Sequence, residues 1–217
     1  SDLADSVAVI AGNTDVRLVF DRACYRFTPL EGYNDFLLQE LRMIALPRHV
    51  AFVDTFSHAF VGINIRCGND FKAPPIHANY DRVGWLQRTP ISWYAESLLA
   101  IRAACGYQVA AVVVSDGREE ILRDILSLEN VTFLRPGRAI TDLLVLTQSR
   151  VLLATASSSF SAWASFLGGM PTISAPGHPL TEWDVRSTPD RFVGNFDPKD
   201  PPSGFLTQAV ARMSAFR

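Results

Sequence analysis

The pattern of apolar and polar positions along this chain is typical of a parallel α/β sheet. From residue 60 onward, short apolar runs rich in β-branched residues alternate with longer segments of mixed polarity. Continuous apolar runs of this length are typical of strands buried on both faces, and the segments between them can form covering helices. We expect neighbouring buried strands over residues 60–65, 108–114, 131–134, 151–154 and 172–174.

Helix signals lie between these runs. Ser92 is a candidate cap for a helix over 93–105, which Gly106 would end. A second helix is expected from the serines at 157–159 to Gly168. Further helices are expected over 33–44, 118–126, 141–148 and 205–216. Strands and helices in this rhythm predict an α/β fold, a Rossmann-like parallel sheet flanked by helices.

The chain divides unequally. Residues 1–48 form a short amino-terminal region, with apolar runs at 6–11 and 16–20, and residues 49–217 carry the Rossmann-like pattern. The first region is too short for a second Rossmann domain. A polar stretch over 67–89 is a long loop of the kind that often forms a binding lid.

Composition narrows the function. A net charge of −2 without lysine or arginine runs indicates no nucleic-acid partner and no attraction to an anionic membrane surface. Apolar runs are too short for a transmembrane segment. Three scattered cysteines lack the spacing of a disulfide framework or a zinc site, so we expect no metal and a cytoplasmic location.

Arg66 directly follows the strand expected at 60–65. Ligands of open α/β sheets bind outside the carboxyl ends of the strands, so this side chain should reach a ligand. The planar guanidinium can hold two phosphate oxygens at once, although a strand-end arginine can also serve as a surface salt bridge.

Two further segments point to the same edge. Ser157, Ser158 and Ser159 open a helix, where unpaired N–H groups and hydroxyls favour an anion, although one serine would suffice as a plain cap. Asp142 stands at the start of the preceding helix, where an acid either complements the helix dipole or reads a base. A carboxylate can accept both guanine N1–H and the N2 amine, which adenine does not offer. We therefore expect Asp142 and Ser158 to hold opposite ends of one nucleotide.

Several motifs carry a resemblance to a known family. Residues 64–70 read Asn64-Ile-Arg-Cys-Gly-Asn-Asp70 and match a His-x-Arg-Arg-Gly-Asp motif. Residues 158–163 read Ser158-Ser-Phe-Ser-Ala-Trp163 and match Ser-Ser-Phe-Ser-x-Trp. Looser matches fall at 93–96, 113–116 and 142–146. On these motifs the chain resembles the α-1,2-fucosyltransferases and the wider superfamily that includes α-1,6- and protein O-fucosyltransferases.

The resemblance implies the nucleotide-binding half of a GT-B glycosyltransferase. Such an enzyme transfers fucose from GDP-fucose to a glycan acceptor hydroxyl, with inversion and with neither a metal nor another cofactor. Carried over to this sequence, Arg66 clamps the β-phosphate, Asp142 reads guanine, and Asp70 is the first candidate for the general base, ahead of His77 and Asp81. The other residues assigned to substrate binding are Asn64, Gly68, Asp116, Ser158, Ser159 and Phe160.

Two departures from the family keep other functions open. Asn64 stands where the family has histidine, and Cys67 stands where it has a second arginine. These changes and the short amino-terminal region favour an alternative function. In that alternative the protein is a non-catalytic nucleotide-sugar or glycan-binding module. They also suggest a partner, or a missing amino-terminal domain, on the acceptor side. Another Rossmann-type nucleotide enzyme is disfavoured because no glycine-rich phosphate loop occurs.

Overall fold

The computed structural model describes residues 27–68, 71–72, 87–135, 138–177, 180–183 and 185–215. The apolar runs expected at 6–11 and 16–20, and the candidate bases Asp70, His77 and Asp81, lie outside the described residues.

Six parallel strands form one sheet in the order β3-β2-β1-β4-β5-β6. Their bounds are β1 Phe60–Ile65, β2 Ala110–Ser115, β3 Val131–Leu134, β4 Val151–Ala154, β5 Thr172–Ser174 and β6 Val193–Asn195. This is the order of a doubly wound Rossmann sheet, in which the strand order reverses between β1 and β4 while all strands stay parallel. Ligand sites form at that reversal, beyond the carboxyl ends of the strands. The predicted fold class is confirmed.

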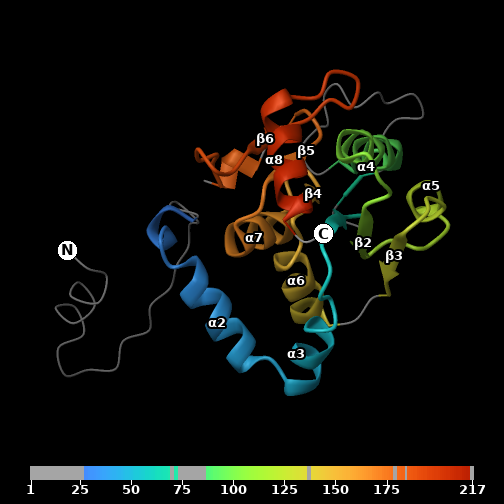
Figure 1. Ribbon diagram of the computed structural model, residues 1–217. Helices are drawn as coiled ribbons and strands as arrows, with labels where there is room; N and C mark the ends of the chain where they lie inside the picture. The colour runs from blue at the N-terminus through green and yellow to red at the C-terminus, as the bar shows by residue number, and fades with distance from the viewer. Residues whose placement is uncertain are drawn as a thin grey trace, which may run out of the picture.

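Helices cover both faces of the sheet (Figure 1). One core layer joins β1 to α4 (Ile91–Cys105), α5 (Arg123–Leu126) and α8 (Ser203–Ser214). On the other face, α6 (Ala139–Thr147) and α7 (Ser159–Gly168) pack on β4. Because both faces are covered, every residue of β1 and β4 is buried, which explains why Asn64 is the one polar residue in their sequences.

The strand predictions hold closely, with two corrections. Four strands match the expected ranges, and β2 is displaced toward its carboxyl end by one or two residues. The expectation that all five are buried is wrong for β3, which is an edge strand with partly exposed residues. The short β6 was not predicted, because its sequence Val193-Gly-Asn195 has no apolar run.

Helix boundaries differ more. Pro90 rather than Ser92 precedes the first residue of α4. The helix expected over 118–126 is reduced to the single turn of α5, because residues 118–122 form turns. The helix α7 begins and ends as expected, with Ser158 as its cap and Gly169 in the left-handed conformation after it.

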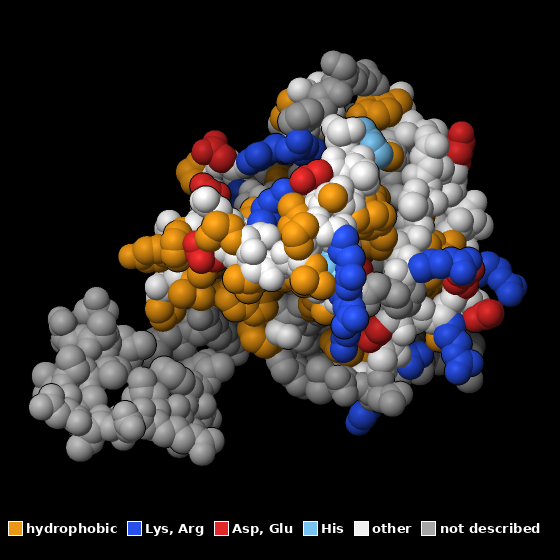
Figure 2. All heavy atoms as spheres, turned by 90° about the horizontal axis from the view of Figure 1, so that it is seen from below, with side chains coloured by type: hydrophobic (Ala, Val, Ile, Leu, Met, Phe, Trp, Pro, Cys, Tyr) orange, Lys and Arg blue, Asp and Glu red, His pale blue; other side chains and the backbone are white. Residues whose placement is uncertain are grey.

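The amino-terminal region adds η1 (Thr28–Leu30), α2 (Asn34–Ile44) and α3 (Pro47–Val53). The helix α2 packs its leucines against α7, and α3 contacts α6. The division at residue 48 falls within α3 and stays a prediction. The outer side of this region, on the face shown in Figure 2, exposes large apolar side chains, namely Tyr33, Phe36, Met43, Ile44, Leu46 and Phe52.

A second η-helix, Leu180–Trp183, precedes β6. In the part of the chain that the structure describes, no helix combines the length and apolarity needed to cross a bilayer.

The close approach of β1 to the turn before β4 provides a test of the fold. A Cβ added to Gly62 would lie 2.7 Å from Ser149 Oγ and 2.8 Å from its Cβ. Overpacking of this kind typically costs about 1–3 kcal/mol. We therefore expect Gly62→Ala to lower the unfolding free energy by that amount in denaturant titrations.

Gly204→Ala is the matched control, because nothing lies within 4 Å of the added Cβ in the first turn of α8. It should leave stability unchanged or slightly raised, since alanine favours helix. Equal stability of the two variants would contradict the described register between β1 and the turn that holds Ser149.

Candidate functional site

A crevice opens at the carboxyl edge of the sheet, beside the reversal of strand order. Part of it is a cavity of about 230 Å³, called here the β1 cavity, between the ends of β1 and β2 and the first turns of α6 and α7. Its lining residues are Asn64, Arg66, Val114, Ser115, Asp116, Ala139, Asp142 and Phe160. Five residues predicted to form the site therefore meet at one cavity, although they come from four separate segments.

Arg66 is held in place by an ion pair with Asp116, with 3.0 Å between Nη1 and Oδ2. The same carboxylate accepts hydrogen bonds from the backbone N–H groups of Cys67 (2.6 Å) and Gly68 (3.1 Å). Asp116 thus anchors the first residues of the loop after β1 and orients the guanidinium that precedes them. Gly68 takes part through this backbone contact, and it is not one of the residues that line the β1 cavity.

Asn64 links β1 to the beginning of α7. Its side-chain oxygen accepts a hydrogen bond of 2.7 Å from Ser161 Oγ, and that hydroxyl accepts from the N–H of Thr155 (3.1 Å). Because the amide oxygen is used in this bond, the group that Asn64 offers to the β1 cavity is its NH₂. A neutral donor therefore stands where the resemblance leads one to expect histidine.

The hydroxyl of Thr155 is a buried junction beneath the site. It donates to the carbonyl of Asn64 (2.7 Å), accepts from the N–H of Arg66 (3.0 Å), and lies 2.9 Å from the hydroxyl of Tyr94. Its single hydrogen goes to the carbonyl, so Tyr94 must be the donor in the third bond. Burial raises the pKa of Tyr94 and keeps the phenol protonated for this role.

The two serines at the start of α7 differ in their exposure to solvent. Ser158 is buried, and its hydroxyl accepts from the N–H of Ser161 as a helix cap. Its side chain does not line the β1 cavity, although Ser158 lies at the same carboxyl edge of the sheet as Arg66. The expectation that both side chains open onto one crevice stays a prediction. Ser159 is exposed on the first turn, whereas Phe160 forms part of the cavity wall. The roles of both serines in nucleotide binding stay predictions.

Asp142 is electrostatically the most unusual residue of the site. It lies in the first turn of α6, and its Oδ1 is buried without a hydrogen-bond partner in the described part of the chain. Burial raises the pKa of this carboxyl from its ordinary 3.8 to about 6. An acceptor buried without donors is unfavourable, and a ligand with N–H groups would remove that penalty.

Asp142 also lines a second cavity of about 470 Å³, the α3 cavity, with His49, Phe52, Leu134, Arg135, Arg138 and Thr141. His49 Nδ1 lies 2.8 Å from the hydroxyl of Thr141, which ties α3 to α6. The sequence analysis did not identify His49 or Phe52, because it predicted no helix at Pro47–Val53. The proline at the start of that helix was the available signal, since proline favours the first helical turn.

No group of three or more histidine, cysteine or acidic side chains within the described residues is placed to hold a metal ion. The polar side chains that line the β1 cavity carry a guanidinium, an amide, a hydroxyl and two carboxyl groups.

This chain has only limited similarity to known proteins. No family model matches the chain, and no curated protein matches it. POFUT1 in complex with GDP aligns over 64% of this chain and 50% of its own, with 15% identity and a TM-score of 0.43. POFUT1 in complex with GDP-fucose aligns over 65% and 49%, with 16% identity and a TM-score of 0.41.

A UDP-forming α,α-trehalose-phosphate synthase from Burkholderia xenovorans aligns over 85% of this chain and 42% of its own, with 12% identity and a TM-score of 0.43. The chain thus spans about half the length of the POFUT1 structures and less of the synthase.

The buried carboxyl of Asp142 predicts a pH-dependent stability. Between about pH 4 and pH 6 the folded protein keeps a proton that the unfolded chain has released. Stability therefore falls as pH rises through about 6. We expect Asp142→Asn to raise Tm relative to the native chain at pH 8, and this gain should shrink toward pH 4 in thermal unfolding.

Asp124→Asn, a change at an exposed carboxylate of α5, is the control and should show no such trend. A Tm difference for Asp142→Asn that stays constant from pH 4 to pH 8 would contradict the raised pKa.

Proposed function

We propose that this protein binds GDP-fucose in the crevice and transfers fucose to a hydroxyl of a glycan acceptor, with inversion and without a metal. The observation that carries the proposal is the buried, unpartnered oxygen of Asp142, placed between two adjoining cavities. The β1 cavity contains the guanidinium fixed by Asp116, and the α3 cavity contains the ring of Phe52 together with Arg135 and Arg138. A guanine nucleotide offers a complementary group to each.

The α3 cavity suits the base. Guanine presents N1–H and its N2 amine side by side, and Asp142 can accept both hydrogen bonds. Phe52 is part of the same cavity wall and offers an aromatic face for the base. Binding would give the buried oxygen its missing donors and stabilise the charged carboxylate, so affinity and ionisation of Asp142 are coupled.

The β1 cavity suits the diphosphate. Arg66 supplies a permanent charge, and the NH₂ group of Asn64 supplies a neutral donor beside it. Charge accumulates on the leaving diphosphate as its bond to the sugar breaks, so a guanidinium already oriented by Asp116 stabilises the transition state more than the bound substrate. In this proposal Asp116 is a positioning residue, because it acts through Arg66 and the loop backbone.

The groups that would act on the acceptor are proposed from the sequence alone. Inverting displacement needs a base that takes the proton of the acceptor hydroxyl as it attacks the sugar, and Asp70 is the candidate nearest in sequence to Arg66. A partner, or a further domain on the amino-terminal side, would complete the acceptor surface. Its absence would leave the sugar open to water.

The second candidate is a binding module without catalysis, and Cys67 is the observation that favours it. This residue occupies the position of the family's second arginine, and it is buried. Burial raises the pKa of its thiol, so the side chain offers neither a positive charge nor a thiolate there. The two candidates share the nucleotide site and differ in turnover.

Base selectivity tests the shared part of both candidates. We expect GDP to bind more tightly than UDP or ADP in calorimetric titrations, because neither of the other bases presents the same donor pair. Asp142→Ala should weaken GDP binding by about 1.5–3 kcal/mol, as expected for hydrogen bonds to a charged group. Asp142→Asn should weaken it nearly as much, since its NH₂ would face the donors of guanine. Equal affinity for GDP and UDP would exclude this role of Asp142.

Arg66 distinguishes the enzyme from the module. If transfer occurs, Arg66→Ala should lower kcat by a larger factor than it raises the Kd for GDP-fucose, because the phosphate charge grows in the transition state. Arg66→Lys should restore only part of the rate, since lysine keeps the charge and loses the planar fork.

The measurement is release of GDP from GDP-fucose, with and without a panel of glycans. The matched control is Arg123→Gln on α5, outside the crevice, which should keep the native rate. If the native protein binds GDP yet releases none from GDP-fucose under any condition, the enzyme is excluded and the binding module remains.

A further inference from the structure

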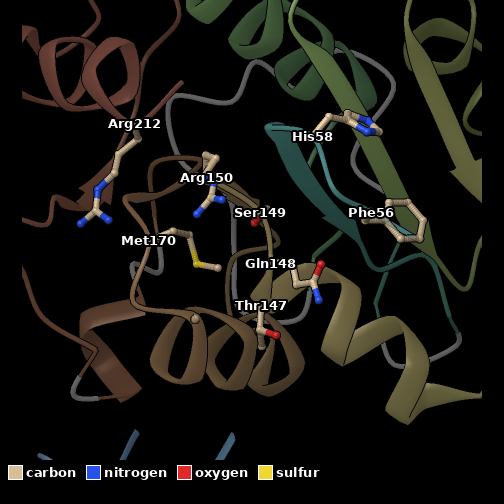
Figure 3. Close-up of a pocket in the computed structure, with 9 residues that line it drawn as sticks. Phe56, His58, Thr147, Gln148, Ser149, Arg150, Met170 and Arg212 are labelled. Atoms are coloured by element: carbon tan, nitrogen blue, oxygen red, sulfur yellow. The ribbon is translucent and has the colours of Figure 1, made fainter. Parts of the chain in front are cut away.

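A third cavity lies at the opposite edge of the sheet from the crevice. It has a volume of about 180 Å³ and is called here the amino-edge cavity (Figure 3). Its lining residues precede β1, β4 and β5 or belong to α8, and they are Phe56, His58, Thr147, Gln148, Ser149, Arg150, Gly168, Met170 and Arg212. None of them takes part in the nucleotide site proposed above.

Positive charge is concentrated at this cavity. Arg150 and Arg212 line it, and no acidic residue is among the described residues of its wall. In Figure 3 the Arg150 side chain points toward Met170, and Arg212 enters from α8. A third arginine, Arg191, donates to the Met170 carbonyl at 3.2 Å.

The positive charge of Arg212 affects the pKa values of two other arginines, Arg150 and Arg191. Burial is the main cause of the lowered pKa values of Arg150 and Arg191, and repulsion from Arg212 lowers both further. An anion at this point would relieve the repulsion, and arginine is the residue best suited to hold phosphate oxygens.

The neutral polar groups of the wall are acceptors rather than donors. Thr147 and Ser149 already donate their hydroxyl hydrogens to the carbonyls of Leu144 (2.8 Å) and Leu146 (2.7 Å). In the amide orientation that suits its neighbours, the Gln148 nitrogen donates to the carbonyls of Val53, the last residue of α3, and of Phe56. A ligand thus meets positively charged donors on one side and oxygen acceptors on the other.

We propose that the amino-edge cavity binds the phosphate group of a small phosphorylated sugar or polyol. The phosphate would lie against Arg150 and Arg212, and hydroxyl groups of the ligand would donate to the acceptor oxygens of the wall. The cavity volume of about 180 Å³ leaves room for a phosphate and part of a sugar. This site is independent of the crevice and of its proposed function.

The ends of α6 and α7 provide the competing explanation. Both helices end at this cavity, and their terminal carbonyls carry partial negative charge that arginines can compensate. If compensation is the only role of these arginines, added phosphate will not bind here. A ligand titration therefore separates the two explanations.

The test uses calorimetry on the whole chain with glucose 6-phosphate, inorganic phosphate and glucose at constant ionic strength. We expect glucose 6-phosphate to bind more tightly than inorganic phosphate, and glucose not to bind. Arg212→Gln, a change at an exposed side chain, should weaken the sugar phosphate at least tenfold, and Arg150→Lys should weaken it less. Arg66→Ala in the crevice and Arg123→Gln on α5 should leave the affinity unchanged.

Three results would overturn the proposal. The first is no binding of either phosphate compound, and the second is binding lost in Arg66→Ala but kept in Arg212→Gln, which would place the anion in the crevice. The third, equal affinity for glucose 6-phosphate and inorganic phosphate, would overturn the sugar part. Arg66→Ala changes only the crevice, so it shows whether a bound phosphate lies there or in the amino-edge cavity. The proposal for the amino-edge cavity can therefore succeed or fail whether or not the crevice binds a nucleotide.

Discussion

The crevice depends on one buried hydroxyl, that of Thr155, where the chain leaves β4. Through it the carbonyl of Asn64, the N–H of Arg66 and the phenol of Tyr94 are joined at the end of β1. Each of these groups would otherwise be a polar group in a dry interior, so the bonds fix the strand end in one arrangement. The position of Arg66 follows from that arrangement. Any ligand that this guanidinium meets is therefore placed by the reversal of strand order between β1 and β4.

Asp116 and Asp142 lie at the same carboxyl edge of the sheet, but they differ in the hydrogen bonds that the protein offers them. Asp116 accepts from a guanidinium and from two backbone N–H groups, so its bonding capacity is taken up by the protein. Asp142 keeps a buried oxygen without a donor, which raises its pKa to about 6. The first carboxylate is explained by the fold alone. The second has no partner for this oxygen among the described residues, and under the proposed function a guanine base supplies the donors.

Most strands of the sheet could be predicted from the sequence. Parallel strands that are covered on both faces must be almost continuously apolar, as in β1 and β4. The sequence also identified Arg66, Asp116 and Asp142, which follow strands or open a helix at one edge. It could not identify Phe52 and His49, since their place beside Asp142 depends on packing between α3 and α6, which are far apart in sequence. It also could not separate Ser158 as cap from Ser158 as ligand, because both roles use the same hydroxyl at the same helix start.

The most direct test of the nucleotide site is the pKa of Asp142 itself, measured by carboxyl ¹³C NMR with and without saturating GDP-fucose. Its diphosphate is doubly esterified and has no ionisation near pH 6 to obscure the titration. The free protein should show a pKa of about 6. Binding should lower it to the ordinary value for aspartate or below, because guanine N–H groups stabilise the charged form. A pKa that stays near 6 in the presence of bound GDP-fucose would contradict base recognition by Asp142.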